Sequence, residues 1–286
     1  MKETAPAKVN LCLFLGPTRS DGRHELVTLF ESISLADELE MTDLDAGPDE
    51  VLCRGVAGPN LVSAALHALR DAGWAGPSVR IEIAKRIPVA AGLGGGSADA
   101  AAALRLASSV EAVDERVLER IAAELGADVP SQLRPGLWLG TGAGEEIEPV
   151  APLAAHGFVI VPQPFPLSTA EVYREADRLG LPRTAAELAD SRSALAAAVA
   201  SGAALPAEIV VNDLEPATVS LAPSVSGALR AVRRAGADQA LVCGSGPTAM
   251  GIFWGEDGPR RADAGAGRLR AEYPQTVSAT PTLASQ

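Results

Sequence analysis

Residues 88–99 read Pro-Val-Ala-Ala-Gly-Leu-Gly-Gly-Gly-Ser-Ala-Asp, and an Ala- and Leu-rich stretch follows to about Val110. The preceding segment, Val79–Ala84, alternates apolar and polar residues as a half-buried strand does. The pattern therefore predicts a strand, a glycine loop and a long helix in succession. Glycines let the backbone come close to a ligand, and the first turn of a helix presents unpaired N–H groups at the positive end of its dipole. These features predict a polyphosphate site at residues 92–97, with Ser97 placed to cap the helix or to reach a phosphate or a metal ion.

This loop differs from the common nucleotide-binding loops. No GxxxxGK[ST] sequence is present, and no lysine follows the glycines. Gly92–Gly95 fit the GxGxxG dinucleotide pattern only loosely, and the flanking pattern does not match the dinucleotide-binding unit. A flexible turn without a ligand is the structural alternative. It is disfavoured because four of the five residues from 92 to 96 are glycines and stand between a strand and a long helix.

The composition limits the class of protein. The chain has 286 residues, of which 47% are hydrophobic and 3% aromatic, and its net charge is −12. This length fits one large domain or two ordinary ones with a real hydrophobic core. A negative surface repels nucleic acid and anionic lipid, and few aromatic side chains leave little for base stacking. We therefore expect no nucleic-acid partner and no membrane partner, while a small ligand stays open.

The cysteines and the N-terminus bear on the cellular compartment. Cys12, Cys53 and Cys243 are widely spaced and fit neither a disulfide framework nor a zinc site, so free thiols in a reducing compartment are expected. No secretory signal is recognised, and no apolar run approaches the length that spans a bilayer. These features predict a cytoplasmic protein.

Strand-like and helix-like segments are mixed along the chain without regular alternation, which favours two α+β domains over a doubly wound sheet. The predicted strands are 8–15, 24–35, 38–42, 79–84, 158–162, 239–243, 249–254 and 276–279, and residues 137–144 are predicted to form a strand and a turn. One helix is predicted before the glycine loop, at residues 60–72. The helices predicted after the loop are the Ala- and Leu-rich segment that ends at about 110, then 115–125, 169–179, 224–235 and 265–273. Residues 255–268 are expected to form a loop or a loose helix start. Prolines cluster between 149 and 166, so we predict domains at 1–151 and 152–286. Whether the last strand returns to the first domain stays open.

Several segments, in this order, resemble the motifs of one family. Pro88-x3-Gly-Leu-Gly-Gly-Gly-Ser-Ala-Asp is similar to the central motif of the GHMP kinases, which include galactokinase, homoserine kinase and mevalonate kinase. The resemblance extends over roughly residues 5–255, through 6–11 (Pro-Ala-Lys-Val-Asn-Leu), 21–30 (Asp-Gly-Arg-His-Glu-Leu-Val-Thr-Leu-Phe), 125–130 (Leu-Gly-Ala-Asp-Val-Pro) and 242–248 (Val-Cys-Gly-Ser-Gly-Pro-Thr). The first two of these segments point to a branch that phosphorylates a tertiary alcohol carrying cytidine diphosphate, in the non-mevalonate route to isoprenoid precursors.

The resemblance implies a fold, a nucleotide and a metal. The first domain would resemble domain 2 of ribosomal protein S5, and the second a ferredoxin-like sandwich, with ATP and acceptor meeting between them. ATP would be the co-substrate, with Mg²⁺ on its β- and γ-phosphates; the sequence offers no clear carboxylate ligand, and Ser97 is the candidate. The residues assigned to ATP are Asn60, Leu61, Pro88, Val89, Ala90, Ala91, Gly92, Leu93, Gly94, Gly95, Gly96, Ser97 and Ala98.

A hydroxyl is a weak nucleophile, so its phosphorylation needs a carboxylate that removes the proton. Asp128 matches the catalytic aspartate of the family, and Lys8 matches its lysine; an ammonium beside the carboxylate would keep it ionised and offset developing charge. The local sequence alone favours a different role for Asp128, because Asp before Val-Pro is a good helix N-cap. The local alternative for Lys8 is a solvated charge at a strand start.

The resemblance also assigns the acceptor side. Asn10, Arg23, His24 and Thr169 match positions that line the acceptor pocket, where Asn10 would hold the diphosphate or diol and His24 the cytosine edge. Arg23 stands where the family usually has tyrosine, and its guanidinium could stack on a base or bind phosphate. A second departure is Ser131-Gln132, where the family often has two aromatic residues. The resemblance also implies that residues 244–248 face the cleft between the domains. The local alternatives are helix capping for Asn60 and Ser168-Thr169, a backbone-bonded loop histidine for His24 and a tight hairpin turn for 244–248.

Two other functions stay open at this point. One is another GHMP kinase acting on a different small alcohol, which the two departures keep in play. The other is a nucleotide-binding regulator without catalysis, which the presence of both Lys8 and Asp128 disfavours. The sequence does not decide between a monomer and a homodimer.

Overall fold

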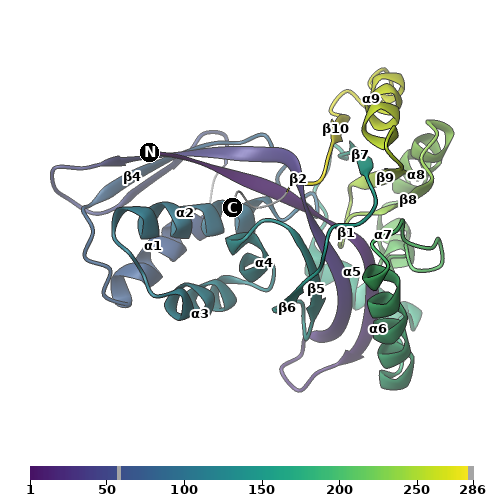
Figure 1. Ribbon diagram of the computed structural model, residues 1–286, viewed down its shortest axis with the longest axis horizontal. Coiled ribbons are helices and arrows are strands. Elements are labelled where there is room, and N and C mark those ends of the chain that lie inside the picture. Colours follow the sequence, from purple (N-terminus) through teal and green to yellow (C-terminus); the bar gives the residue numbers. More distant parts are fainter. Residues whose placement is uncertain (57–58, 283–286) are drawn as a thin grey trace.

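The strands form two sheets, one in each half of a computed structural model that describes residues 1–56 and 59–282 (Figure 1). The first sheet has the order β3-β4-β2-β5-β6, with β1 paired to β2, and the second has the order β10-β7-β9-β8. The strands of the first sheet are β1 (Lys2–Thr18), β2 (His24–Asp43), β3 (Glu50–Cys53), β4 (Val79–Ala84), β5 (Leu137–Thr141) and β6 (Glu146–Pro149). Those of the second are β7 (His156–Val161), β8 (Gln239–Val242), β9 (Ala249–Trp254) and β10 (Val277–Ala279).

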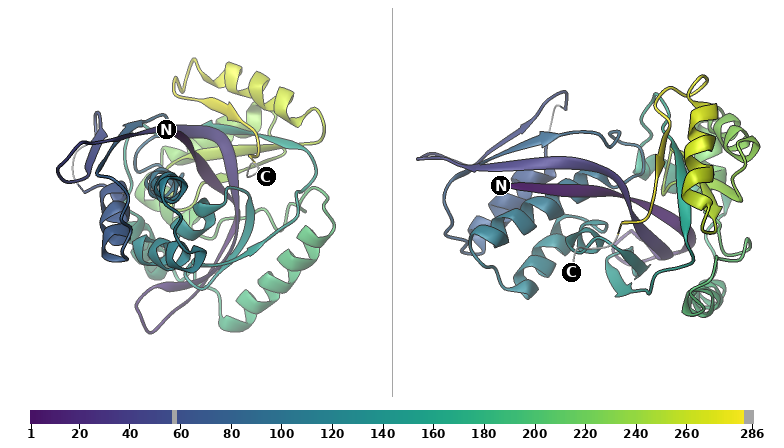
Figure 2. Two further views of the ribbon diagram at one scale, coloured as in Figure 1. Left: turned by 60° about the vertical axis from the view of Figure 1, so that its left-hand side comes forward. Right: turned by 45° about the horizontal axis from the view of Figure 1, so that its top comes forward.

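Helices cover the outer face of each sheet, as the two views of Figure 2 show. In the first half they are α1 (Leu61–Asp71), α2 (Gly95–Val110), α3 (Glu115–Leu125) and α4 (Val129–Leu133). In the second half they are α8 (Val225–Arg234) and α9 (Gly258–Leu269), while α5 (Thr169–Leu179), α6 (Ala185–Ala200) and α7 (Glu215–Leu221) pack with the hairpin of β1 and β2. The predicted α+β class is confirmed, and the predicted boundary at 151/152 falls in the connection from β6 to β7. Among the described residues, no helix has the length and apolarity needed to cross a membrane.

The long hairpin of β1 and β2 links the two halves. Successive side chains of a strand point to opposite faces, so Val9 and Leu11 lie on one side of β1 while Lys8 and Asn10 lie on the other. The apolar side belongs to a core cluster that also holds Phe158 of β7, so this face of the first sheet packs against the second half. The polar side faces the helices of the first half, and this alternation brings the two polar side chains to the candidate site.

Most predicted elements agree with the structure, but two of them need correction, and strands β3 and β6 were not predicted. Residues 24–43 form one strand, where two were predicted. Helix α9 begins at Gly258, within a segment predicted as a loop or loose helix start. Pro259 suits a first helical turn, and Gly265 faces the sheet so closely that an added Cβ would lie 3.1 Å from Phe253 Cζ. The small residues that this packing requires weaken the helical pattern in the sequence.

The chain after β10 returns to the first half. β10 pairs with β7, and beyond it the Ser34 amide donates to Thr280 O (2.8 Å) and the Thr282 amide to Ser32 O (2.8 Å). The strand near 276–279 therefore belongs to the second sheet, while the residues that follow lie along β2.

A buried ion pair joins the halves. His156 Nε2 lies 2.8 Å from Glu31 Oε2, and its Nδ1 lies 2.7 Å from Ala154 O. Because a carbonyl only accepts, Nδ1 carries a proton. Burial alone would lower the pKa of His156, but the hydrogen bond and charge of Glu31 outweigh it and raise the pKa above the ordinary value.

The pH dependence of the unfolding free energy should reveal the Glu31–His156 pair. A histidine whose pKa is raised on folding contributes stability that is complete below its unfolded pKa of about 6.5 and is lost as the pH rises through its folded pKa. We expect the difference in unfolding free energy between the wild type and a Glu31→Gln/His156→Gln double variant to shrink as the pH rises from about 6 into the alkaline range. Urea unfolding over this range measures it; a difference that is flat or grows with pH would contradict the charged pair.

Candidate functional site

A cavity of about 470 Å³ lies between the glycine loop and residues from both halves of the chain. The predicted site residues that line it are Lys8, Asn10, Asn60, Leu61, Pro88, Val89, Ala90, Ala91, Gly92, Leu93, Gly94, Gly95, Gly96, Ser97, Asp128 and Thr169. Gly244 and Ser245 complete one wall, so the turn between β8 and β9 faces the cavity as well as closing a hairpin. The structure thus gathers segments that are more than 150 residues apart in the sequence.

The glycine loop is held in a conformation that most residues avoid. Gly92 has φ +79°, Gly94 has φ +67° and Ala90 has φ +53°. An added Cβ at Gly92 would collide with the backbone oxygen of Cys243, and one at Gly94 would lie 2.9 Å from Lys8 Cγ. Helix α2 begins directly after Gly94, so its free amides open onto the cavity. This arrangement forms an anion site from backbone amides.

Lys8 and Asp128 meet in this cavity. Lys8 is 5% exposed, and its Nζ donates to Asn10 Oδ1 (2.8 Å) and lies 3.5 Å from Asp128 Oδ2. The ammonium also sits over the ring of Phe30, 5.0 Å from its centroid. Asn10 Nδ2 in turn donates to Thr28 Oγ1 (2.8 Å), so both polar groups of this amide are engaged. The chain of contacts fixes the ammonium next to a carboxylate.

Asp128 does not use its carboxylate as a helix cap. It directly precedes α4, with Pro130 in the first turn, but its side chain makes no capping hydrogen bond. The cap suggested by the local sequence is therefore wrong, and the carboxylate is left facing Lys8. Asn60 differs: its side chain caps α1 by accepting from Val62 N (2.8 Å) and also lines the cavity. Ser168 caps α5, while the next residue, Thr169, lies in the cavity.

Three predicted residues lie outside the cavity lining. Ala98 packs in the core beneath α2. His24 is buried behind the cavity, where its Nε2 contacts Asp177 Oδ1 at 2.8 Å and its ring lies 5.3 Å from that of Tyr173. Arg23 is half exposed and pairs with acidic residues of the surface, so the structure does not bring its guanidinium to the cavity.

The comparisons with known proteins agree with this geometry. Two family models match the chain, the GHMP kinases N terminal domain over residues 60–136 and the GHMP kinases C terminal over residues 188–275. A 4-diphosphocytidyl-2-C-methyl-D-erythritol kinase of Mycolicibacterium gilvum is 42% identical over 253 residues, which cover 85% of this chain and 79% of that protein. The chain belongs to the GHMP kinase family.

Other relatives of this GHMP kinase support the same family assignment. A 4-diphosphocytidyl-2-C-methyl-D-erythritol kinase of Streptomyces coelicolor is 42% identical over 276 residues, covering 93% of this chain and 91% of that protein. A crystal structure of a 4-(cytidine 5'-diphospho)-2C-methyl-D-erythritol kinase superposes with a TM-score of 0.78 at 34% identity, covering the whole of both chains. A mevalonate kinase of L. major, at 16% identity and a TM-score of 0.69, shares the fold. The chain is an ATP-dependent phosphotransferase.

One site residue of this GHMP kinase that the sequence analysis missed is Tyr173. It lines the cavity near Thr169, whose Oγ1 lies 3.0 Å from Ser245 Oγ. Burial raises the pKa of Tyr173, and the charge of Asp128 adds to this, so the phenol stays neutral. The spacing contained the signal, because residues four apart on a predicted helix share one face.

A buried cluster behind the glycine loop was also missed. Lys85 Nζ contacts Asp37 and donates to Asp99 Oδ2 (2.8 Å), and Lys85 and Asp99 both line the cavity. Burial raises the pKa of Asp99 to about 7, although Lys85 opposes the shift. No local pattern indicates this cluster, because its members come from β2, the residue after β4 and α2.

A metal ion finds few protein ligands here. Among the described residues, no group of three or more His, Cys, Asp or Glu side chains is arranged to hold one. Ser97 lines the cavity beside the glycine loop. A Mg²⁺ ion usually keeps several waters and binds through phosphate oxygens, and this donor set fits an ion that arrives with the nucleotide.

Proposed function

We propose that this kinase transfers the γ-phosphate of ATP to the 2-hydroxyl of 4-diphosphocytidyl-2-C-methyl-D-erythritol. The observation that carries the proposal is the Lys8–Asp128 contact of 3.5 Å, made inside the cavity that the glycine loop opens onto. The relatives at about 40% identity support the choice of acceptor, because they carry the name of the kinase for this substrate.

The nucleotide binds at the glycine loop in this proposal. Amides of residues 92–97 donate to the phosphate oxygens at the start of α2, where the helix dipole favours negative charge. Asn60 and Leu61, which line the same cavity, contact the base. Ser97 is the candidate protein ligand for Mg²⁺, which would neutralise charge on the β- and γ-phosphates.

Asp128 acts as the general base. It accepts the proton of the 2-hydroxyl while the oxygen forms its bond to the γ-phosphorus and the bond from that phosphorus to the β–γ bridging oxygen breaks, releasing ADP. Lys8 lies beside this carboxylate and stabilises negative charge that develops on the transferred group. Asn10 holds the ammonium in place, since its amide oxygen is already engaged by Lys8.

The acceptor lies between Asp128 and α5. Tyr173 offers an aromatic face for the cytosine, and Thr169 offers a hydroxyl from the same face of the helix. His24 lies behind Tyr173 and supports this wall. The acceptor carries cytidine diphosphate and is consumed in the non-mevalonate route to isoprenoid precursors, and the proposal includes a cytoplasmic location for the enzyme.

A panel of alcohols tests the acceptor. We expect ATP-dependent ADP release with the cytidine diphosphate substrate to exceed that with homoserine or mevalonate by at least about a thousandfold in kcat/KM, because a pocket built for polar groups rejects molecules that leave them unpaired. Coupled ADP detection with equal concentrations of each alcohol measures it. Faster turnover of another alcohol would instead support a kinase of different specificity, and ATP binding without turnover on any alcohol would support a non-catalytic role.

A further inference from the structure

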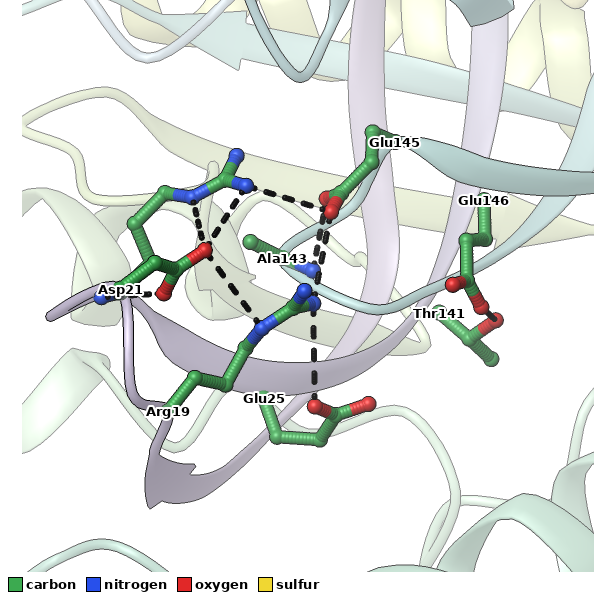
Figure 3. A network of polar contacts seen from close by, with 8 residues as sticks. Arg19, Asp21, Glu25, Thr141, Ala143, Glu145 and Glu146 are labelled. Atoms are coloured by element: carbon green, nitrogen blue, oxygen red, sulfur yellow. Dashed lines mark hydrogen bonds and ion pairs between the residues drawn. The ribbon is translucent and has the colours of Figure 1, made fainter.

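The hairpin loop between β1 and β2 is tied to the turn between β5 and β6 by a single carboxylate. Glu145 Oε1 accepts from Arg19 Nη1 (3.3 Å) and Arg23 Nη2 (3.4 Å), while its Oε2 accepts from Ala143 N (2.7 Å). Figure 3 shows the labelled Arg19 and Glu145 pointing toward one another across the gap between the two segments. One side chain therefore connects two loops more than 100 residues apart.

The backbone at Gly142 leaves room for the Arg19–Glu145 contact. Gly142 has φ +68°, and an added Cβ there would lie 3.0 Å from Arg19 Nη1, so the guanidinium rests directly on this glycine. The Leu26 amide donates to Gly142 O (2.6 Å), which joins the same two segments a few residues further on. Glu145 is 19% exposed in its side chain, whereas that of Arg23 is 52% exposed. The carboxylate is thus the inner, sheltered partner.

The charges in this cluster argue against a phosphate site. Two guanidinium groups, of Arg19 and Arg23, face three carboxylates, of Asp21, Glu25 and Glu145. A phosphate would have to displace these carboxylates and would meet a net negative surrounding. The arginine that stands where the family usually has tyrosine is therefore used here as a tether.

The loop adjoins the acceptor side of the site. Thr18 and His24 are paired across the hairpin, with Thr18 Oγ1 3.3 Å from His24 Nε2, and residues 19–23 span the gap between them. The His24 ring in turn packs against Tyr173, which lines the cavity. A displacement of the loop would therefore shift the cavity wall through the Thr18–His24 and His24–Tyr173 contacts.

We propose that Glu145 is a positioning residue for the acceptor: it holds the 19–23 loop through Arg19 and Arg23, so that His24 keeps Tyr173 in place. This inference rests on the proposed function, since it concerns the acceptor end of the same site. It assigns Arg23 a structural contact with Glu145 in place of a direct contact with the cytosine.

Glu145→Gln tests the tether, with Glu146→Gln as the matched control. Glu146 is the adjacent carboxylate, which accepts from Thr141 Oγ1 (3.2 Å) and contacts neither arginine (Figure 3). Because two charge-assisted contacts are lost, we expect Glu145→Gln to raise KM for the cytidine diphosphate acceptor about three- to tenfold, with kcat and the KM for ATP within about twofold of wild type. The control should match wild type in all three constants.

A double-mutant cycle separates tethering from direct binding. If Arg23 acts through Glu145, the effects of Arg23→Met and Glu145→Gln on the acceptor KM are sub-additive, because each removes the same contact. Effects that multiply fully would show that Arg23 contacts the acceptor independently, and would overturn the proposal. An unchanged acceptor KM in Glu145→Gln, or an equal rise in both glutamine variants, would overturn it as well.

Hydrogen exchange gives a readout that does not depend on turnover. The amides of Arg19 and Gly22 are bonded within the loop, and we expect them to exchange at least about threefold faster in Glu145→Gln than in Glu146→Gln. Unchanged exchange would refute the tether even in an active enzyme. Faster exchange in a protein that fails to use the cytidine acceptor would instead keep the tether and remove the proposed function.

Discussion

Replacing Asp128 by asparagine is expected to lower kcat by about a thousandfold while the Kd for ATP stays within about twofold of wild type. Asparagine keeps the size and a hydrogen-bonding oxygen but cannot accept the proton of the acceptor hydroxyl. The fold should tolerate the change, because the carboxylate makes no capping hydrogen bond and contacts the solvent-accessible cavity. Steady-state kinetics with the cytidine diphosphate acceptor, with calorimetric titration of ATP, measures both constants.

A control aspartate distinguishes catalysis from stability. Asp114 is the N-cap of α3 and accepts from Arg116 N (2.9 Å), away from the cavity. Asp114→Asn should leave kcat unchanged, since asparagine also caps helices well. If Asp128→Asn kept more than about a tenth of wild-type kcat, a different group would have to serve as the base.

Gly92→Ala is expected to weaken ATP binding by about tenfold or more and to lower the melting temperature. The alanine would have to adopt φ +79°, which costs about 1–2 kcal/mol, and its Cβ would collide with Cys243 O. The collision would push the glycine loop away from the turn at 244–246. The amides of the loop would then no longer point together at the phosphates. Titration of a non-hydrolysable ATP analogue and a thermal melt measure the two effects.

Gly96→Ala is the matched control for this loop. Gly96 lies in the first turn of α2, and an added Cβ meets only Leu61 Cδ1 at an ordinary 3.6 Å. The backbone amide is retained, and alanine favours the helix by up to about 1 kcal/mol, so ATP affinity should stay close to wild type. Equal losses in both variants would mean that the loop tolerates no methyl group anywhere, and would remove the special role assigned to the conformation of Gly92.

The sequence predicted the elements whose pattern is local. The alternation of Val79–Ala84 and the helix at Thr169–Leu179 have the bounds that the structure shows, because each pattern needs only its own residues. The glycine loop was recognised for the same reason. Helix α9 was partly missed, since close packing on the sheet selects small residues that carry little helical signal.

Only those site residues that belong to a recognisable sequence motif were predicted. Lys8 and Asp128 were brought together by the resemblance to a family, whereas the local sequence favoured a helix cap for Asp128. Contacts that depend on the tertiary structure were not predictable. Examples are the ion pairs Lys85–Asp99 and Arg23–Glu145, because no sequence pattern links the segments that they connect. Arg23 shows the limit clearly, because its chemistry suits base stacking, phosphate binding and a salt bridge, and the positions of Asp21 and Glu145 in the folded chain distinguish them.

In the proposed reaction, the glycine loop presents a triphosphate to a hydroxyl activated by Asp128. A crystal structure with a non-hydrolysable ATP analogue and the cytidine diphosphate acceptor tests it most directly. We expect phosphate oxygens within hydrogen-bond distance of amides between Gly92 and Ser97, and the acceptor 2-hydroxyl about 2.6–3.2 Å from an Asp128 oxygen. A triphosphate bound away from residues 92–97, or an acceptor hydroxyl out of reach of Asp128, would contradict it.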